Sequence, residues 1–231
     1  MGENNEQYRR HRERTAETQR ELARAGRDIG PIPPIRNPRR RKKAIGSFLY
    51  FLKTHLAAAF PLPFSDDHHT VITKIERAVK DGGQFAEAMA RGSGKSTICR
   101  GACLWAPLTG LRKFIVLVGA TANRGIGMVD DVNKIIETNP LLLEDFPEVV
   151  FPFRAMERSN NRAKGQMCLG EYTWIERTAG ELVFPTIPGS LSSGVKLLGT
   201  GIEGGELRGL SHTLADGRTI RPDMIIGDDL Q

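Results

Sequence analysis

The stretch AEAMARGSGKSTICRGA, residues 86–102, decides how the rest of the chain is interpreted. Its Gly-Lys-Ser at 94–96 completes most of the pattern G-x-x-x-x-G-K-[ST], but Met89 stands where that pattern has its first glycine. A loop of this kind binds phosphate because small residues let backbone N–H groups approach the oxygens and because a helix begins there. The sequence predicts both flanks of such a loop, a short strand over 84–90 and a helix over 94–105.

Each residue type in this loop suits one part of a nucleotide. Lys95 is placed to reach the β- and γ-phosphates of ATP, and Ser96 is placed to hold Mg²⁺. The alternative is an ordinary helix N-terminus capped by Ser93, with an exposed lysine. The predicted nucleotide-binding residues are Gly92, Ser93, Gly94, Lys95, Ser96 and Thr97.

Arg91 is the unusual residue of the loop, because it occupies a place that glycine would leave open. It precedes Lys95 by four residues, so its guanidinium can lie beside the γ-phosphate and act as an arginine finger from the same chain. The alternative is a surface arginine without a role in the site.

An acidic pair near the end of the chain provides the second half of an ATPase site. The apolar run MIIG leads into Asp228 and Asp229, and Asp228 lies 133 residues after Lys95. We expect Asp228 to hold Mg²⁺ and Asp229 to orient the attacking water, although aspartate is one methylene shorter than the glutamate common there. Predicted strands at 113–121 and 195–202 separate the two motifs, which favours the P-loop branch with an additional strand.

The hydrophobic pattern predicts an α/β fold with a central, mainly parallel sheet flanked by helices. KFIVLVGAT at 113–121 is the clearest strand, and its unbroken apolar run indicates burial on both faces. The other predicted strands are 195–202 and 221–229, with β-hairpin material at 165–187. Further helices are predicted at 45–59, 68–83 and 125–139.

The positive charge is concentrated at the N-terminus. Residues 1–43 contain 13 Arg and Lys against 6 Asp and Glu, whereas the remaining 188 residues contain 20 against 21. We therefore predict a basic, flexible arm and linker over 1–43 and a P-loop domain over 44–231. Such an arm attracts nucleic acid through phosphate contacts, and a simply solvated tail is the alternative.

Other features of the composition exclude some classes of protein. No apolar run approaches the roughly 20 residues of a membrane-spanning helix, so we expect no membrane partner. The N-terminus has no signal-peptide pattern. Cys99, Cys103 and Cys168 make no disulfide framework, and the first two share one helix face, which favours core packing over metal binding.

Taken in order, these motifs resemble one family. The basic N-terminal region, ARGSGKS, KFIVLVGAT, GIEGGELRGL and RPDMIIGDD are similar to the ATPase domain of bacteriophage terminase large subunits, over about residues 60–231. Loops of that family often lack the first glycine and carry an arginine. The resemblance implies a RecA-like fold, ATP and Mg²⁺ as cofactors, and translocation of double-stranded viral DNA into a procapsid.

The resemblance also implies partners and further site residues. The partners are the portal and procapsid, the terminase small subunit and other copies in a ring, in the cytoplasm of an infected or lysogenic bacterial host. Terminases place an adenine-contacting segment before the loop, for which Gln84, His68 and His69 are the candidates here; the alternative for each is an ordinary polar residue of a helix or strand edge. Arg208 acts on a neighbouring subunit or on DNA, or is a surface residue.

Family members continue past the acidic pair through a coupling motif and a nuclease domain. We therefore expect this chain to be the N-terminal part of a longer product, with the nuclease absent from it. Two alternatives stay open: a helicase-like P-loop ATPase, and an inactive fragment that only binds DNA or packaging partners.

Overall fold

The centre of the fold is a five-stranded mixed sheet. In the computed structural model, which describes residues 12, 14–15, 17–18, 26–90, 92–203, 207 and 209–230, its strand order is β4-β5-β6-β1-β9. Strands β6, β1 and β9 run parallel, and β5 and β4 are added antiparallel at the β6 edge. The sheet strands are β4 (Glu176–Thr178), β5 (Glu181–Val183), β6 (Lys196–Gly201), β1 (Phe114–Gly119) and β9 (Met224–Asp228).

Strand β1 is central because every one of its residues is buried. Its side chains alternate between two apolar clusters. Ile115 and Leu117 face the main core with the helices, while Phe114, Val116 and Val118 face a small cluster on the other side. The predicted α/β class with a buried strand at 113–121 is thus confirmed.

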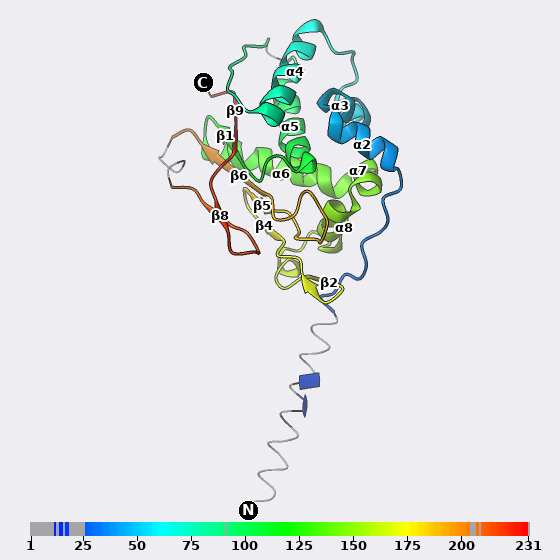
Figure 1. The fold of residues 1–231 in the computed structure, drawn as a ribbon. Helices are drawn as coiled ribbons and strands as arrows, with labels where there is room; N and C mark the ends of the chain where they lie inside the picture. The colour runs from blue at the N-terminus through cyan, green and yellow to red at the C-terminus, as the bar shows by residue number, and fades with distance from the viewer. Residues whose placement is uncertain are drawn as a thin grey trace, which may run out of the picture.

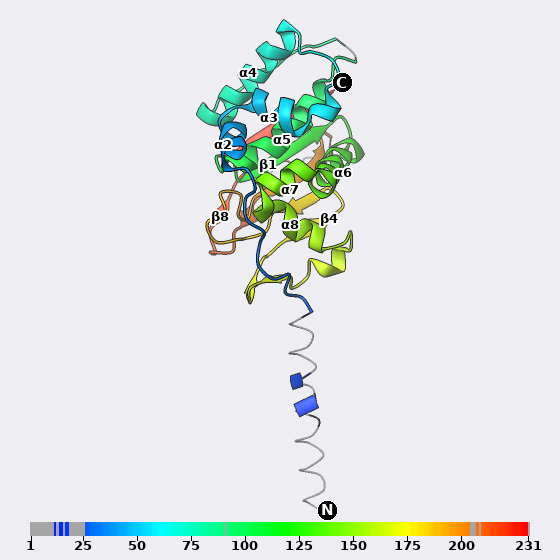
Figure 2. The same cartoon turned by 90° about the vertical axis from the view of Figure 1, so that its right-hand side faces the viewer.

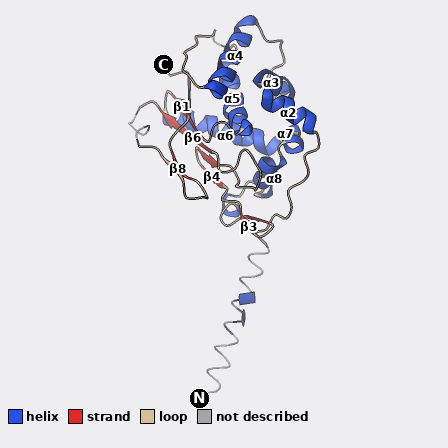
Figure 3. Ribbon diagram, viewed as in Figure 1, coloured by secondary structure: helices blue, strands red, loops and turns tan. Residues whose placement is uncertain are grey.

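The helices gather on one side of the sheet, as Figures 1 and 3 show. On the other side a small hairpin, labelled at β8 in Figure 2, packs its Ile220 against the cluster of Phe114, Val116 and Val118. That hairpin pairs β7 (His212–Thr213) with β8 (Thr219–Ile220). The helices are α2 (Pro38–Gly46), α3 (Phe48–His55), η1 (Ala57–Ala59), α4 (Asp66–Asp81), α5 (Lys95–Thr109), α6 (Ala122–Thr138), α7 (Pro140–Asp145), α8 (Pro147–Ala155) and η2 (Asn160–Arg162).

Hydrophobic periodicity placed most elements correctly. The predicted helix at 68–83 is α4, and its spaced Val71, Ile75 and Val79 are all buried. The predicted helix at 125–139 is α6. The hairpin material at 165–187 contains the pair β2 (Met167–Cys168) and β3 (Glu171–Tyr172) as well as the pair β4 and β5.

The strand predicted over 84–90 does not form. Residues 82–90 have no regular structure and are mostly exposed. A strand needs a partner, and β1 already pairs with β6 on one edge and β9 on the other. Ala and Glu also favour strands poorly. The segment is held by side chains instead, through an ion pair of Glu87 with Lys74 on α4 and through Met89, which packs against the core.

Two predictions near the N-terminus also need correction. The helix expected at 45–59 is broken at Ser47, whose hydroxyl accepts a hydrogen bond from the Tyr50 N–H and so caps a new helix, α3. Residues 28–43 are not an extended linker throughout, because α2 begins at Pro38 and packs onto the body. The division into an arm and a domain at residue 43 stays a prediction.

A buried ion-pair network attaches α2 and α3 to the rest of the molecule. The Asp145 carboxylate, at the end of α7, is fully buried. It accepts hydrogen bonds from the Arg40 guanidinium at 2.6 and 2.8 Å and lies 2.8 Å from His55 Nε2. Burial lowers the pKa of His55, so the ring is neutral near pH 7 and Nε2–H donates. Trp105 of α5 adds a hydrogen bond from its indole N–H to the Ala44 carbonyl.

Helix α6 lies unusually close to strands β1 and β6. A Cβ on Gly125 would meet the Thr200 carbonyl oxygen at 2.1 Å, and one on Gly199 would meet the Gly125 carbonyl oxygen at 2.2 Å. At the strand ends, a Cβ on Gly119 would lie 2.5 Å from Arg124 Cβ. Because glycine has no side chain, these positions let the backbone of α6 contact the backbone of the sheet. This contact fixes the position of the first turn of α6.

Candidate functional site

The candidate site lies at the carboxyl edge of the parallel strands. The last residues of β1 and β9, Gly119 and Asp228, are paired in register. Helix α5 begins at Lys95, and α6 begins at Ala122 directly after β1. Open α/β sheets bind ligands at this edge because loops and helix N-termini converge there. The fold thus brings together the two motifs that the sequence separates by 133 residues.

The loop before α5 depends on glycine. Gly92 has φ +80° and Gly94 has φ +83°, left-handed values that other residues adopt at a cost. Gly94 is the residue before the helix, so the first N–H groups of α5 have no acceptor within the helix. The Ser93 hydroxyl is buried, and among the described residues it has no hydrogen-bond partner. The loop therefore presents unsatisfied donors.

Lys95 meets the acidic pair directly. Its Nζ lies 3.7 Å from Asp229 Oδ1, and both side chains are partly exposed, at 32% and 58%. Asp229 has φ +51°, a left-handed conformation that aspartate tolerates better than most residues. An ion pair this exposed adds little to stability. It leaves the lysine free to exchange its carboxylate partner for another anion.

His68 supports the loop from the N-terminal end of α4. Its Nδ1 accepts from the Ser65 backbone N–H at 3.0 Å, so Nε2 carries the proton. Nε2–H then donates to the Ser93 carbonyl oxygen at 2.6 Å. His69, the other histidine proposed to contact adenine, instead lies edge-on to Phe64. His68 thus contacts the loop backbone, and any contact of either ring with a base stays a prediction.

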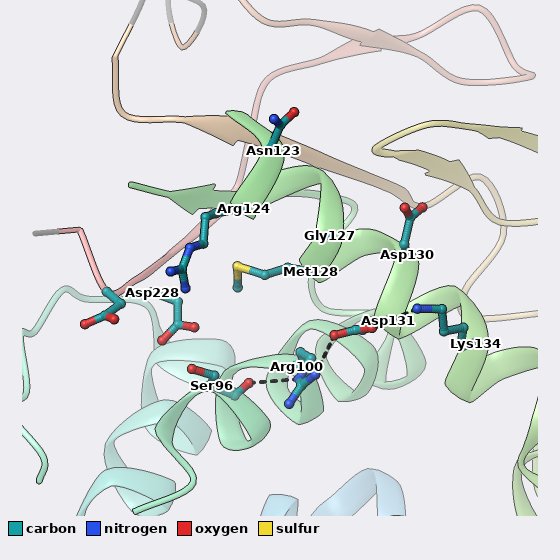
Figure 4. A pocket seen from close by; sticks show the side chains of 11 residues that line it. Ser96, Arg100, Asn123, Arg124, Gly127, Met128, Asp130, Asp131, Lys134 and Asp228 are labelled. Atoms are coloured by element: carbon teal, nitrogen blue, oxygen red, sulfur yellow. Dashed lines mark hydrogen bonds and ion pairs between the residues drawn. The ribbon is translucent and has the colours of Figure 1, made fainter. Parts of the chain in front are cut away.

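A cleft of about 430 Å³ opens between the two helix N-termini. At one end, Figure 4 shows Ser96, Arg124 and Asp228 together, and Asp130, Asp131 and Lys134 stand at the other. The full lining is Ser96, Arg100, Asn123, Arg124, Gly127, Met128, Asp130, Asp131, Lys134, Asp228 and Asp229. Three predicted residues, Ser96, Asp228 and Asp229, thus share one cavity.

Several charged residues of this cleft escaped the sequence-based prediction. Arg100 donates to Asp131 at 2.5 Å and to the Thr97 hydroxyl at 3.2 Å. Lys134 lies 3.3 Å from the same Asp131. The available signal was position: Arg124 follows the Gly-Ala-Thr turn after the best predicted strand, where a helix beginning at the sheet edge would place it near the loop.

Some predicted residues do not enter this arrangement. Gln84 lies in the exposed 82–90 segment and does not line the cleft. Arg91 and Arg208 lie outside the described residues, so their predicted roles are not addressed by the geometry. Cys99 and Cys103 face the core, and burial raises the pKa of Cys99 to about 12 and that of Cys103 well above its usual value. Both thiols are therefore protonated at neutral pH.

The chain matches no family model, curated protein or solved structure with which it was compared. The site must therefore be judged on its own geometry. Within the described part of the chain, no three or more His, Cys, Asp or Glu side chains gather as a metal-binding group. The same part contains no helix long and apolar enough to cross a bilayer.

The oxygen donors of the cleft nevertheless suit one hard cation held jointly with phosphate. Mg²⁺ is usually bound by one or two protein oxygens together with water and phosphate oxygens, and not by a full protein cage. Ser96 and Asp228 are such a pair, because both line the cleft beside unsatisfied donors of the loop. The residues present therefore fit a magnesium–nucleotide complex.

Proposed function

We propose that the chain binds and hydrolyses ATP as the ATPase part of a terminase-type DNA-packaging motor. The observation that carries the proposal is the 3.7 Å approach of Lys95 Nζ to Asp229 Oδ1. A phosphate-binding lysine next to a strand-end acidic pair is the arrangement that P-loop hydrolysis requires. The glycine conformations of the loop support the same function, as does the Ser93 hydroxyl, which has no partner in the described part of the chain.

In this proposal each residue acts on a different part of the nucleotide. The loop from Gly92 to Gly94 and the first turn of α5 bind the phosphates through N–H groups, and Lys95 neutralises their charge. On ATP binding, Lys95 leaves Asp229, and the freed carboxylate accepts a hydrogen bond from the attacking water. Arg91 places further positive charge at the γ-phosphate, as its position in the sequence predicts.

Magnesium, when bound with ATP, withdraws charge from the phosphate oxygens. Ser96 and Asp228 are the residues that would hold it, through the hydroxyl and the carboxylate. Among the described residues, Asp228 has no ion pair to break before it takes this role.

The motor function is the finer part of the proposal and has separate support. It comes from the order of motifs shared with terminases and from the net positive charge of residues 1–43. A basic segment binds double-stranded DNA through its phosphates, and this binding weakens as salt is added. Translocation requires that such binding of DNA be coupled to ATP hydrolysis.

The first experiment measures ATP binding and turnover with Mg²⁺ in the wild-type chain and in Lys95→Ala. We expect Lys95→Ala to weaken ATP binding by about tenfold or more and to abolish measurable turnover, because it removes the charge that faces the phosphates. Lys42→Ala, which removes an exposed lysine of α2, is the matched control and should change neither quantity. Turnover that survives in Lys95→Ala would contradict the proposal.

A second arm of the experiment addresses the motor. Turnover is compared without DNA, with double-stranded DNA, and with double-stranded DNA at raised salt. We expect stimulation by DNA that diminishes as salt increases. Equal turnover in all three conditions would rule out the DNA motor while leaving the ATPase intact.

A further inference from the structure

Arg124, in the first turn of α6, is a cation of the cleft to which the proposed function gives no role. The other two cations of the lining are both paired with Asp131, Arg100 at 2.5 Å and Lys134 at 3.3 Å. Among the described residues, no ion pair or side-chain hydrogen bond engages the guanidinium of Arg124. An unpaired guanidinium in a cleft with four aspartates is available for an incoming anion.

The fold fixes the position of this side chain. Gly119 at the end of β1 pairs with Asp228, and the same glycine leaves room for Arg124, whose Cβ would lie 2.5 Å from any Cβ added there. Arg124 therefore lies beside the strand end that carries Asp228. Figure 4 shows its side chain directed toward the end of the cleft where Asp228 and Ser96 lie.

This position distinguishes the terminal phosphate from the others. The loop stands at the N-terminus of α5, where its N–H groups would surround the α- and β-phosphates, and Lys95 would reach the β- and γ-phosphates. Ser96 and Asp228 would hold Mg²⁺, which would offset part of the negative charge of the phosphates. Arg124 approaches from the opposite wall, on α6, so the group within its reach is the one farthest from the loop.

Resting on the proposed function, we infer that Arg124 binds the γ-phosphate and makes the site selective for nucleoside triphosphate over diphosphate. A guanidinium donates two parallel hydrogen bonds to phosphate oxygens, and these form only when the third phosphate is present. Charge moving onto those oxygens during hydrolysis strengthens the contact, so Arg124 also accelerates turnover.

The test is the ratio of two affinities. Binding of a non-hydrolysable ATP analogue and of ADP, each with Mg²⁺, is measured by calorimetry for the wild type, Arg124→Ala and Arg124→Lys. We expect Arg124→Ala to weaken the triphosphate analogue by about tenfold or more and to change ADP affinity by less than about twofold. Arg124→Lys keeps the charge but loses the paired hydrogen bonds. Its affinity for the triphosphate analogue should therefore lie between those of the wild type and Arg124→Ala.

The controls distinguish failure of this inference from failure of the proposed ATPase function. Arg39→Ala removes an exposed arginine of α2 and should leave both affinities unchanged. Arg124 is exposed, so its variants should unfold at the wild-type temperature. If the wild type binds both nucleotides, and Arg124→Ala weakens the binding of both equally or of neither, the inference alone is overturned. Failure of the wild type to bind either nucleotide would overturn both the inference and the proposed function.

Discussion

At the scale of single residues, the nucleotide loop is held from outside by one histidine. His68 connects the Ser65 backbone N–H to the Ser93 carbonyl oxygen, and its proton lies on Nε2 because Nδ1 is already an acceptor. The loop itself contains two left-handed glycines, which are flexible in the unfolded chain, and a buried Ser93 hydroxyl that has no partner among the described residues. A hydrogen bond to its backbone therefore selects one conformation from many.

We accordingly predict that His68→Ala weakens ATP binding several-fold and lowers the free energy of unfolding by about 1 kcal/mol, the usual contribution of one hydrogen bond. Arg77→Ala is the matched control, since it removes an exposed side chain farther along α4. Calorimetric titration and chemical unfolding measure the two quantities. Equal effects of the two substitutions would show that His68 does not position the loop.

At the scale of elements, the position of α6 depends on the absence of side chains. Gly125 faces the Thr200 backbone, whereas Gly127, two residues later on the same helix, has no atom within 4 Å of an added Cβ. Substitution by alanine should therefore change the free energy of unfolding in opposite directions at these two positions. Because α6 carries Arg124 and one wall of the cleft, a displacement of this helix reaches the candidate site.

We predict that Gly125→Ala lowers the free energy of unfolding by about 3 kcal/mol, because backbone must move to admit the methyl group. Gly127→Ala should raise the free energy of unfolding by about 0.5–1 kcal/mol, because alanine favours a helix more than glycine does. Denaturant unfolding of both variants measures the difference. Stabilisation by both substitutions would mean that α6 does not lie in close contact with β6.

Elements whose residues carry their own periodic pattern were predictable from the sequence. Strand β1 and helices α4 and α6 are examples, because each buries a regular set of apolar side chains. Strand β9 follows its pattern less fully, since Met224 and Ile226 are half-buried against the core while Ile225 is exposed. The segment 84–90 was mispredicted because a strand also depends on pairing with a neighbour, and among the described residues this segment pairs with no strand of the sheet. Local sequence contains no information on that neighbour.

The candidate site divides along the same line. The meeting of Lys95 with the acidic pair was predicted because each motif has a recognisable pattern. The strand at 84–90 that was expected to bring them together does not form, and α5 packs against β9 instead. The presence of Arg124 in the cleft was not predictable, because it follows from the pairing of Gly119 with Asp228 and from contacts between glycines and backbone. Such contacts join residues that are up to 109 positions apart and leave no local pattern.

At the scale of the whole molecule, a few charged residues join the N-terminal helices to the body. Arg40 reaches across 105 positions to Asp145, and its neighbour Arg41 binds Glu148. Hydrogen bonds to Asp145 raise the pKa of Arg40 still further, so this guanidinium stays charged. Part of the N-terminal positive charge is thus paired with carboxylates of the fold. The residues available to DNA are fewer than the net charge of that segment suggests.

This network predicts an unequal effect of two neighbouring carboxylates. Asp145→Ala should lower the free energy of unfolding by about 3–5 kcal/mol, because it leaves the Arg40 charge without its buried partner and His55 Nε2–H without an acceptor. Glu144→Ala, which removes a carboxylate that binds the same arginine near the surface, should cost about 0–1 kcal/mol. Chemical unfolding of both variants tests the difference. A loss below about 1 kcal/mol in both variants would mean that apolar packing alone holds α2 and α3 to the body, without a contribution from these ion pairs.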